Sequence, residues 1–134
     1  MNKVLVEIQN VTRESLSFEI RPGDSFSSVL NRYMSESQLT VSKLSARSGI
    51  CQNAITEYRM GKHIPKDIHR VVALCIGLQI NEHRAEYLIN LAHFSIGYDT
   101  QGMAYRMLIS LAFSTGLTLS QGNEILSDLD LPKL

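Results

Sequence analysis

Residues 39–65 read LTVSKLSARSGICQNAITEYRMGKHIP, and this stretch decides the fold. Thr40 can begin a short helix, because its hydroxyl can accept a hydrogen bond from a backbone N–H of the first turn. Leu44 then faces inward. Gly49 stands where that helix must stop and the chain must turn sharply, a position that favours a residue tolerant of positive φ.

A second short helix is expected to begin at Cys51 or Gln52 and to end at Gly61. Its apolar positions are Ile55 and Tyr58, which lie three residues apart and therefore share one side of the helix. Two helices joined by such a tight turn are typical of a helix-turn-helix, whose second helix is free to enter a DNA major groove.

A common spacing pattern extends over roughly residues 25 to 92. Its members are Leu39, Thr40, Leu44, Ala46, Gly49, Ile50, Ile55, Gly61, Lys62, Pro65, Val71, Val72, Ala73, Leu74 and Leu78. In these residues the chain resembles the phage-repressor-like, Cro/XRE-type helix-turn-helix family. The resemblance implies a five-helix DNA-binding unit.

Two positions depart from the family pattern. The family usually has an acidic residue where this chain has Arg59, so a pair of reversed polarity, Arg59 with Glu36, is one arrangement open to it. The residue after the first helix cap often contacts a phosphate, and here it is Val41.

The whole-chain composition is ordinary for a globular protein, with 134 residues, 44% hydrophobic and 19% charged. This length suits one domain, or one small domain with an appendage. No apolar run approaches the roughly 20 residues that span a bilayer. The first residues do not have the pattern of a secretory leader. We therefore expect a cytoplasmic or nucleoid-associated protein that does not bind membranes.

A net charge of zero hides an asymmetry along the chain. Residues 41–70 carry six basic and two acidic residues, a net charge of +4. Residues 81–134 carry three basic and six acidic residues, a net charge of −3. Positive charge therefore coincides with the segment assigned to DNA.

Three segments are expected. Residues 1–24 alternate apolar and polar residues in two runs, which predicts a short N-terminal arm or β-hairpin, either packed on the helices or forming a dimer seam. Residues 25–94 form the helix-turn-helix DNA-binding domain. Residues 95–134 form a C-terminal helical hairpin for packing or dimerisation. The expected fold class is all-α, a lambda-repressor-like unit with these two additions.

Several helix ends can be predicted from capping residues. Asp24 or Ser25 would cap the first helix of the unit, and Asn81 the fifth. The helix after Pro65 would end at Gly77, and the last helix would be capped by Ser120. The inward positions of the first C-terminal helix would be Ala104, Met107, Leu108, Leu111 and Ala112.

Four residues at the start of the second short helix are expected to read bases: Gln52, Asn53, Thr56 and Glu57. Gln and Asn amides can each bind adenine through N6 and N7, and a Glu carboxylate can accept from cytosine N4. Gln52 is the first candidate and Asn53 the second.

A second group of residues is expected to contact phosphates, which positions a protein on DNA without reading sequence. Its members are Thr40, Lys43, Arg59, Lys62, His63 and Lys66. Thr40 would add the free N–H groups of its helix start. Lys43 and Arg59 could instead form pairs within the protein.

No motif for catalysis, a metal or a cofactor is found. His63, His69, His83 and His93 lack metal-ligand spacing, and no phosphate loop, nucleophile elbow or carboxylate dyad appears. Of the two cysteines, Cys75 has the setting of a buried residue. Cys51 would stand at a helix start, where a thiol can be reactive or can simply replace a Ser cap.

The expected function is sequence-specific transcriptional regulation, with the helix at about residues 51–59 inserted into the major groove of double-stranded DNA. Units of this size usually bind palindromic sites as homodimers. The alternative is a protein-interaction module or antitoxin-like adaptor that binds a protein through residues 95–134. An enzyme is a third class, which no constellation of residues supports.

Overall fold

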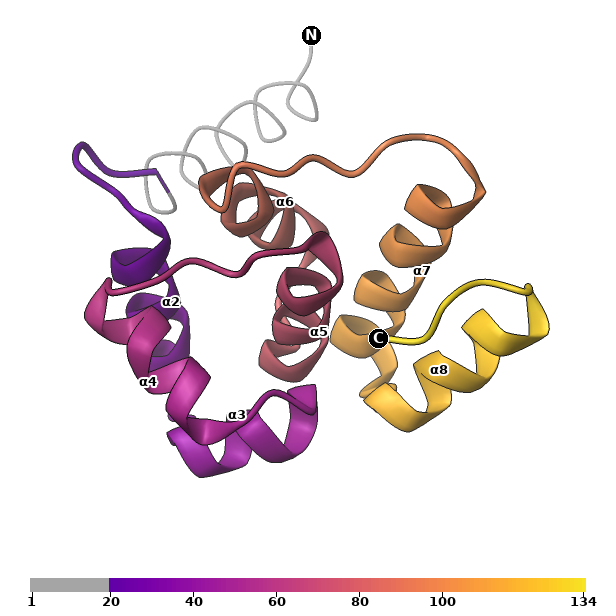
Figure 1. The fold of residues 1–134 in the computed structure, drawn as a ribbon, viewed down its shortest axis with the longest axis horizontal. Helices are drawn as coiled ribbons and strands as arrows, with labels where there is room; N and C mark the ends of the chain where they lie inside the picture. The colour runs from indigo at the N-terminus through magenta and orange to yellow at the C-terminus, as the bar shows by residue number, and fades with distance from the viewer. Residues whose placement is uncertain (1–19) are drawn as a thin grey trace, which may run out of the picture.

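The computed structural model describes residues 20–134, and this part of the chain contains seven helices and no strand (Figure 1). The all-α class is therefore confirmed for the described residues. Residues 1–19, on which most of the predicted arm or β-hairpin falls, lie outside them. The helices are α2 (Phe26–Glu36), α3 (Val41–Ser48), α4 (Gln52–Met60), α5 (Ile68–Leu78), α6 (Glu82–Leu91), α7 (Thr100–Thr115) and α8 (Leu119–Asp128).

Most helix ends follow from local capping, as predicted. The Thr40 hydroxyl accepts a hydrogen bond of 3.1 Å from the N–H of Lys43, and the Asn81 side chain accepts one from Arg84. Ser25, and not Asp24, caps α2. Three helices end at glycines with left-handed backbone, namely Gly49, Gly61 and Gly116.

The predicted end of α5 at Gly77 is wrong. The helix continues to Leu78, and Gln79 adopts the left-handed conformation instead. Gly77 has a different role, because a Cβ there would lie 3.0 Å from Leu44 Cδ1 and 3.2 Å from the backbone N of Ser48. Glycine at this position thus permits close contact between α5 and α3.

The C-terminal hairpin also differs from prediction at two points. Thr118, and not Ser120, caps α8, and it forms a reciprocal capping box with Gln121. Met107 is exposed on α7, whereas Ala104 and Leu108 are buried as expected. Met107 was predicted to face inward because α7 is apolar on more than one side.

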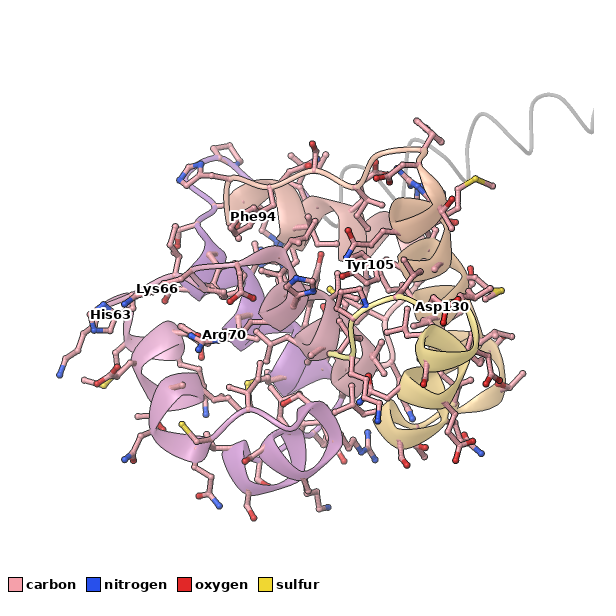
Figure 2. All side chains as sticks on the ribbon, turned by 45° about the vertical axis from the view of Figure 1, so that its right-hand side comes forward. His63, Lys66, Arg70, Phe94, Tyr105 and Asp130 are labelled. Carbon is pink, nitrogen blue, oxygen red and sulfur yellow. The ribbon has the colours of Figure 1, made fainter. Side chains whose placement is uncertain are left out.

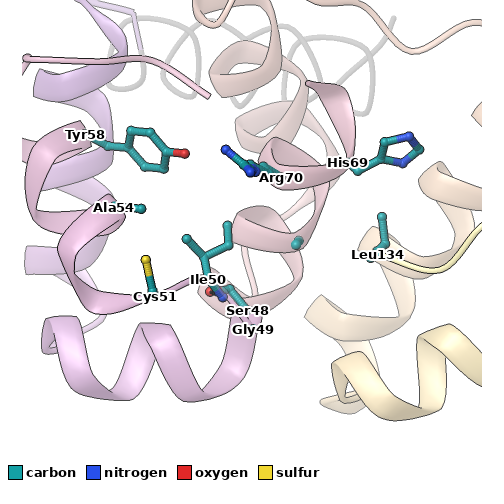
Figure 3. Close-up of a pocket in the computed structure, with 10 residues that line it drawn as sticks. Ser48, Gly49, Ile50, Cys51, Ala54, Tyr58, His69, Arg70 and Leu134 are labelled. Atoms are coloured by element: carbon teal, nitrogen blue, oxygen red, sulfur yellow. Dashed lines mark hydrogen bonds between the residues drawn. The ribbon is translucent and has the colours of Figure 1, made fainter. Parts of the chain in front are cut away.

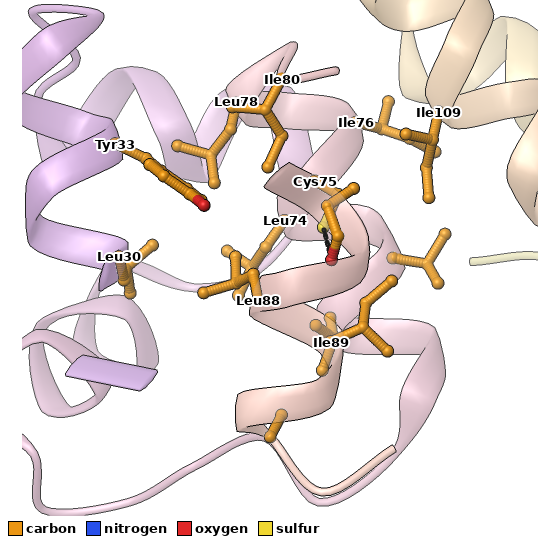
Figure 4. Packing of buried hydrophobic residues seen from close by; sticks show 14 of the residues in the cluster. Leu30, Tyr33, Leu74, Cys75, Ile76, Leu78, Ile80, Leu88, Ile89 and Ile109 are labelled. Atoms are coloured by element: carbon orange, nitrogen blue, oxygen red, sulfur yellow. Dashed lines mark hydrogen bonds between the residues drawn. The ribbon is translucent and has the colours of Figure 1, made fainter. Parts of the chain in front are cut away.

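Helix α5 lies at the centre of the molecule and contacts α3, α6, α7 and α8 (Figure 1). Every residue from Val71 to Leu78 is buried. Figure 4 shows how Leu88 of α6 and Ile109 of α7 take part in the same apolar cluster. Cys75 belongs to it, and burial raises the pKa of its thiol. The C-terminal helices therefore share one core with the rest of the described chain. None of the helices in this part is long and apolar enough to cross a membrane.

A nearly buried carboxylate ties the start of α2 to α6. Asp24 forms two hydrogen bonds with Arg32, at 3.0 and 3.1 Å, and accepts a third from the Tyr87 hydroxyl at 2.7 Å. The side chains of Asp24 and Arg32 are only 7% and 12% exposed. The pKa of Asp24 lies well below its usual value, chiefly because the hydrogen bonds from Arg32 stabilise the ionised form. Burial acts in the opposite direction but is outweighed.

We predict that Gly77→Ala lowers the free energy of unfolding by about 1–3 kcal/mol, because the added methyl group would have to displace α3. Urea denaturation measures the change. Gly122→Ala is the matched control, since a Cβ at that helical glycine would make only ordinary contacts of 3.5 Å or more. If both variants were as stable as the parent, close α3–α5 contact would not require glycine.

A second prediction concerns how the stability of the fold depends on Asp24 at low pH. Asp24→Asn should lower the free energy of unfolding by about 2–4 kcal/mol at pH 7, because it removes the carboxylate that binds the nearly buried guanidinium of Arg32 with two hydrogen bonds. A carboxylate whose pKa is lowered by folding stabilises the protein above its unfolded pKa. The difference in the free energy of unfolding between parent and variant should therefore narrow by about 1.4 kcal/mol for each pH unit below about pH 3.9, the pKa of an unfolded Asp. Urea unfolding at pH 7 and pH 3 tests this, with the exposed Asp128→Asn as control. A difference independent of pH would contradict it.

Candidate nucleic-acid interface

Helix α4 packs on α2 and α3, and a short turn, Gly49–Cys51, joins it to α3. Its buried side chains are Ile55 and Tyr58, as predicted. The Tyr58 ring meets the edge of Phe26 on α2, with 6.1 Å between ring centroids. The inner side of α4 is thus held by apolar contacts.

The end of α4 is anchored by hydrogen bonds from α2. Ser27 Oγ and Asn31 Nδ2 both donate to the backbone carbonyl of Arg59, at 2.8 and 2.9 Å. Asn31 Oδ1 also accepts from Arg59 Nε at 2.6 Å. One asparagine therefore binds both the backbone and the side chain of the same α4 residue, which sets the position of the helix end.

The opposite side of α4 carries the predicted base-reading residues. Gln52, Asn53 and Thr56 are exposed, and Glu57 is partly exposed. This side of α4 is therefore accessible to a partner. It also carries Met60, whose side chain is 61% exposed and lies seven positions after Asn53. Met60 was not among the predicted residues, although its helical spacing could have indicated it.

Glu57 has a neighbour within the protein. Its carboxylate lies 3.5 Å from His63 Nε2, and both side chains are about half exposed. This contact is an ion pair only when the imidazole is protonated. Glu57 and His63 therefore lie side by side on the surface, and the base-reading role of Glu57 and the phosphate contact of His63 stay predictions.

The other predicted phosphate contacts lie at the two ends of the α3–α4 pair. Thr40 and Lys43 are exposed at the start of α3, and Lys62 and Lys66 on the segment after α4. Figure 2 shows His63 and Lys66 on that segment at the edge of the molecule. The Thr40 hydroxyl accepts the cap hydrogen bond, so its own proton is still available to an acceptor.

Arg59 is committed to Asn31 through its Nε, and it does not pair with Glu36. Glu36 binds Arg84 instead, at 2.7 Å. The reversed pair that the sequence left open does not form, because Arg84 of α6 supplies the cation for Glu36. Two further cations near the site, Arg47 and Arg70, were not predicted as contacts. Both are exposed, and Arg70 Nε lies 3.8 Å from Asp67.

Comparison of the chain with protein families, with curated proteins and with solved structures finds no match. Among residues 20–134, no group of three His, Cys, Asp or Glu side chains is placed to hold a metal ion.

We predict that Asn31→Ala lowers the free energy of unfolding by about 1–3 kcal/mol, since it leaves the Arg59 guanidinium without one acceptor and its carbonyl without one donor. Urea denaturation gives the magnitude, and ¹⁵N–¹H spectra should show the largest amide shifts at the end of α4. Ser35→Ala, on the exposed side of α2, is the control. A loss below about 0.5 kcal/mol, as for an ordinary surface substitution, would speak against this anchor.

Proposed function

We propose that the chain is a sequence-specific DNA-binding transcriptional regulator of the Cro/XRE type. In this proposal α2–α6 form a lambda-repressor-like unit, and α4 enters the major groove. The observation that carries it is the two-sided character of α4. Its inner side is anchored by Ile55, Tyr58 and the Asn31 hydrogen bonds, while its outer side presents amide and hydroxyl groups.

The outer side of α4 suits direct reading of base edges. Gln52 and Asn53 occupy its first turn, where side chains of a recognition helix reach the groove floor. Their amides match the donor and acceptor pair of adenine. Thr56 and the newly identified Met60 can contact a thymine methyl group. Glu57 would read cytosine only by leaving His63.

The surrounding charges suit the DNA backbone. Lys43 lies at the start of α3, and Lys62 and Lys66 lie after α4, so cations stand at both ends of the α3–α4 pair. None of these three lysines forms an ion pair with a residue in the described range. Each would therefore be free to displace a counterion from a phosphate.

We further propose that DNA is bound by two copies. A two-fold dimer requires a self-complementary surface, and α7 offers exposed Met103, Met107 and Phe113. The one charged residue of α7, Arg106, is engaged by Glu82 and by the Ile96 carbonyl. This surface, which also includes the exposed Ser110 and Ser114, has no free charge and can meet its own copy without repulsion.

Selection of bound sequences from a randomised duplex library tests the proposal. We expect an inverted repeat with half-sites about one helical turn apart and a complex of two chains per duplex. Gln52→Ala should weaken binding by about 1–3 kcal/mol and relax preference at one base position per half-site. Lys62→Gln is the matched comparison. It should weaken binding to all sequences alike, and it should reduce the slope of the log binding constant against log salt concentration by about 0.9 per chain.

Absence of any salt-dependent duplex binding would contradict the proposal. If Gln52→Ala weakened binding to all DNA sequences equally, the base-reading side of α4 would be wrongly assigned. One chain bound to a single half-site would contradict the dimer. It would leave the apolar surface of α7 to a protein partner, as in the adaptor alternative.

A further inference from the structure

A cavity of about 360 Å³ lies behind the reading helix, between α4 and α5 (Figure 3). Its walls include Ala54 and Tyr58 of α4, Arg70 and Ala73 of α5, Ile50 of the turn, and Leu134. The volume is at the lower end of the range for small-molecule sites, roughly 300–1,000 Å³. None of the proposed base-reading residues lines this cavity, and neither does any lysine proposed to contact phosphates. The cavity is connected to the base-reading residues only because α4 carries both.

The Tyr58 hydroxyl is one polar group that a ligand could bind in the cavity. The side chain is only 4% exposed, and its ring is fixed by Phe26. Figure 3 shows the hydroxyl pointing into the cavity toward Arg70. It forms no hydrogen bond with any residue from 20 to 134. The hydroxyl oxygen keeps contact with solvent, so it can donate a hydrogen bond to a ligand that enters the cavity.

The Arg70 guanidinium supplies a second donor to the same space. Its Nε faces Asp67 at 3.8 Å, while its terminal nitrogens point toward Tyr58 (Figure 3). His69, also at the wall, is already engaged, because its Nδ1 lies 2.7 Å from the Tyr105 hydroxyl. A cation and a hydroxyl therefore line the same cavity and face each other in Figure 3, and a carboxylate has two oxygens that could accept from them.

Much of the remaining wall is apolar, although Ser48, Gly49 and Cys51 also line it. The side chains of Ile50, Ala54, Ala73 and Leu134 are hydrocarbon, and the two alanines leave space that larger side chains would fill. A fully hydrated inorganic anion would gain nothing from these residues. A molecule with an anionic end and a compact hydrocarbon body would cover them and would expel water from them.

We propose that this cavity binds a small organic carboxylate, with its carboxylate on Arg70 and Tyr58 and its hydrocarbon part against Ile50, Ala54 and Ala73. Since α4 forms one wall, the bound molecule would also favour one position of the reading helix. This second statement, that the ligand acts as an effector of DNA binding, rests on the proposed function. Binding itself does not.

The experiment titrates the full ¹⁵N-labelled chain, without DNA, with benzoate and with hexanoate. Benzamide and hexanamide are the neutral counterparts. We expect saturable shifts of amides along the cavity wall with at least one carboxylate and much weaker binding of its amide. Arg70→Gln should reduce the affinity about tenfold, and Tyr58→Phe, which keeps the ring in place, about threefold to tenfold. Arg47→Gln removes the same charge from the neighbouring α3 and should leave the affinity unchanged.

Several outcomes would overturn the proposal: no saturable shift with either carboxylate, equal binding of carboxylate and amide, or affinity unaffected by both cavity variants. Loss of affinity for all duplexes in Arg70→Gln, without carboxylate binding, would assign Arg70 to the DNA backbone instead. The effector statement is tested separately, by measuring duplex affinity with and without the carboxylate that binds. If the chain binds no duplex at all, the titration still decides whether the cavity is a ligand site.

Discussion

The enclosure of α5 is the constraint on which the described structure depends. A helix that is buried from Val71 to Leu78 must be covered on every side, and α3, α6, α7 and α8 provide that cover. Gly77 lets α3 come within contact distance of its backbone. Because α3 is fixed on α5, the short turn after it fixes where α4 can begin. The position of α4 is thus set, through α3, by the buried α5.

Helix α4 takes part in both the proposed DNA-reading surface and the proposed carboxylate site. Its outer side carries polar groups that suit base edges, its inner side packs on α2 through Tyr58, and its flank forms a cavity with α5. Tyr58 takes part in two of these, with its ring in the core and its hydroxyl in the cavity. A ligand held by that hydroxyl would be linked to the DNA-reading side through a single helix of nine residues.

Capping and core positions could be predicted well because their causes are local. Thr40, Gly49 and Gly61 act on backbone groups within a few residues, so their spacing alone indicates where α3 and α4 begin and end. Prediction failed where one residue type serves two purposes. Gly77 was interpreted as a helix end, but its missing side chain is needed for close packing. Met107 fits an inward pattern on a helix that is apolar on several sides, and it is exposed.

The candidate site divides in the same way. The exposure of Gln52, Asn53 and Thr56 could be predicted from helical periodicity, because the order of residues within one short segment is enough to show which side of a helix each occupies. The partners of Arg59 and Glu36 do not, because Asn31 precedes Arg59 by 28 positions and Arg84 follows Glu36 by 48. The cavity beside Tyr58 depends on Leu134 and on α5 as well. Such contacts arise when distant segments pack together, and their geometry is a property of the folded chain that local spacing does not encode.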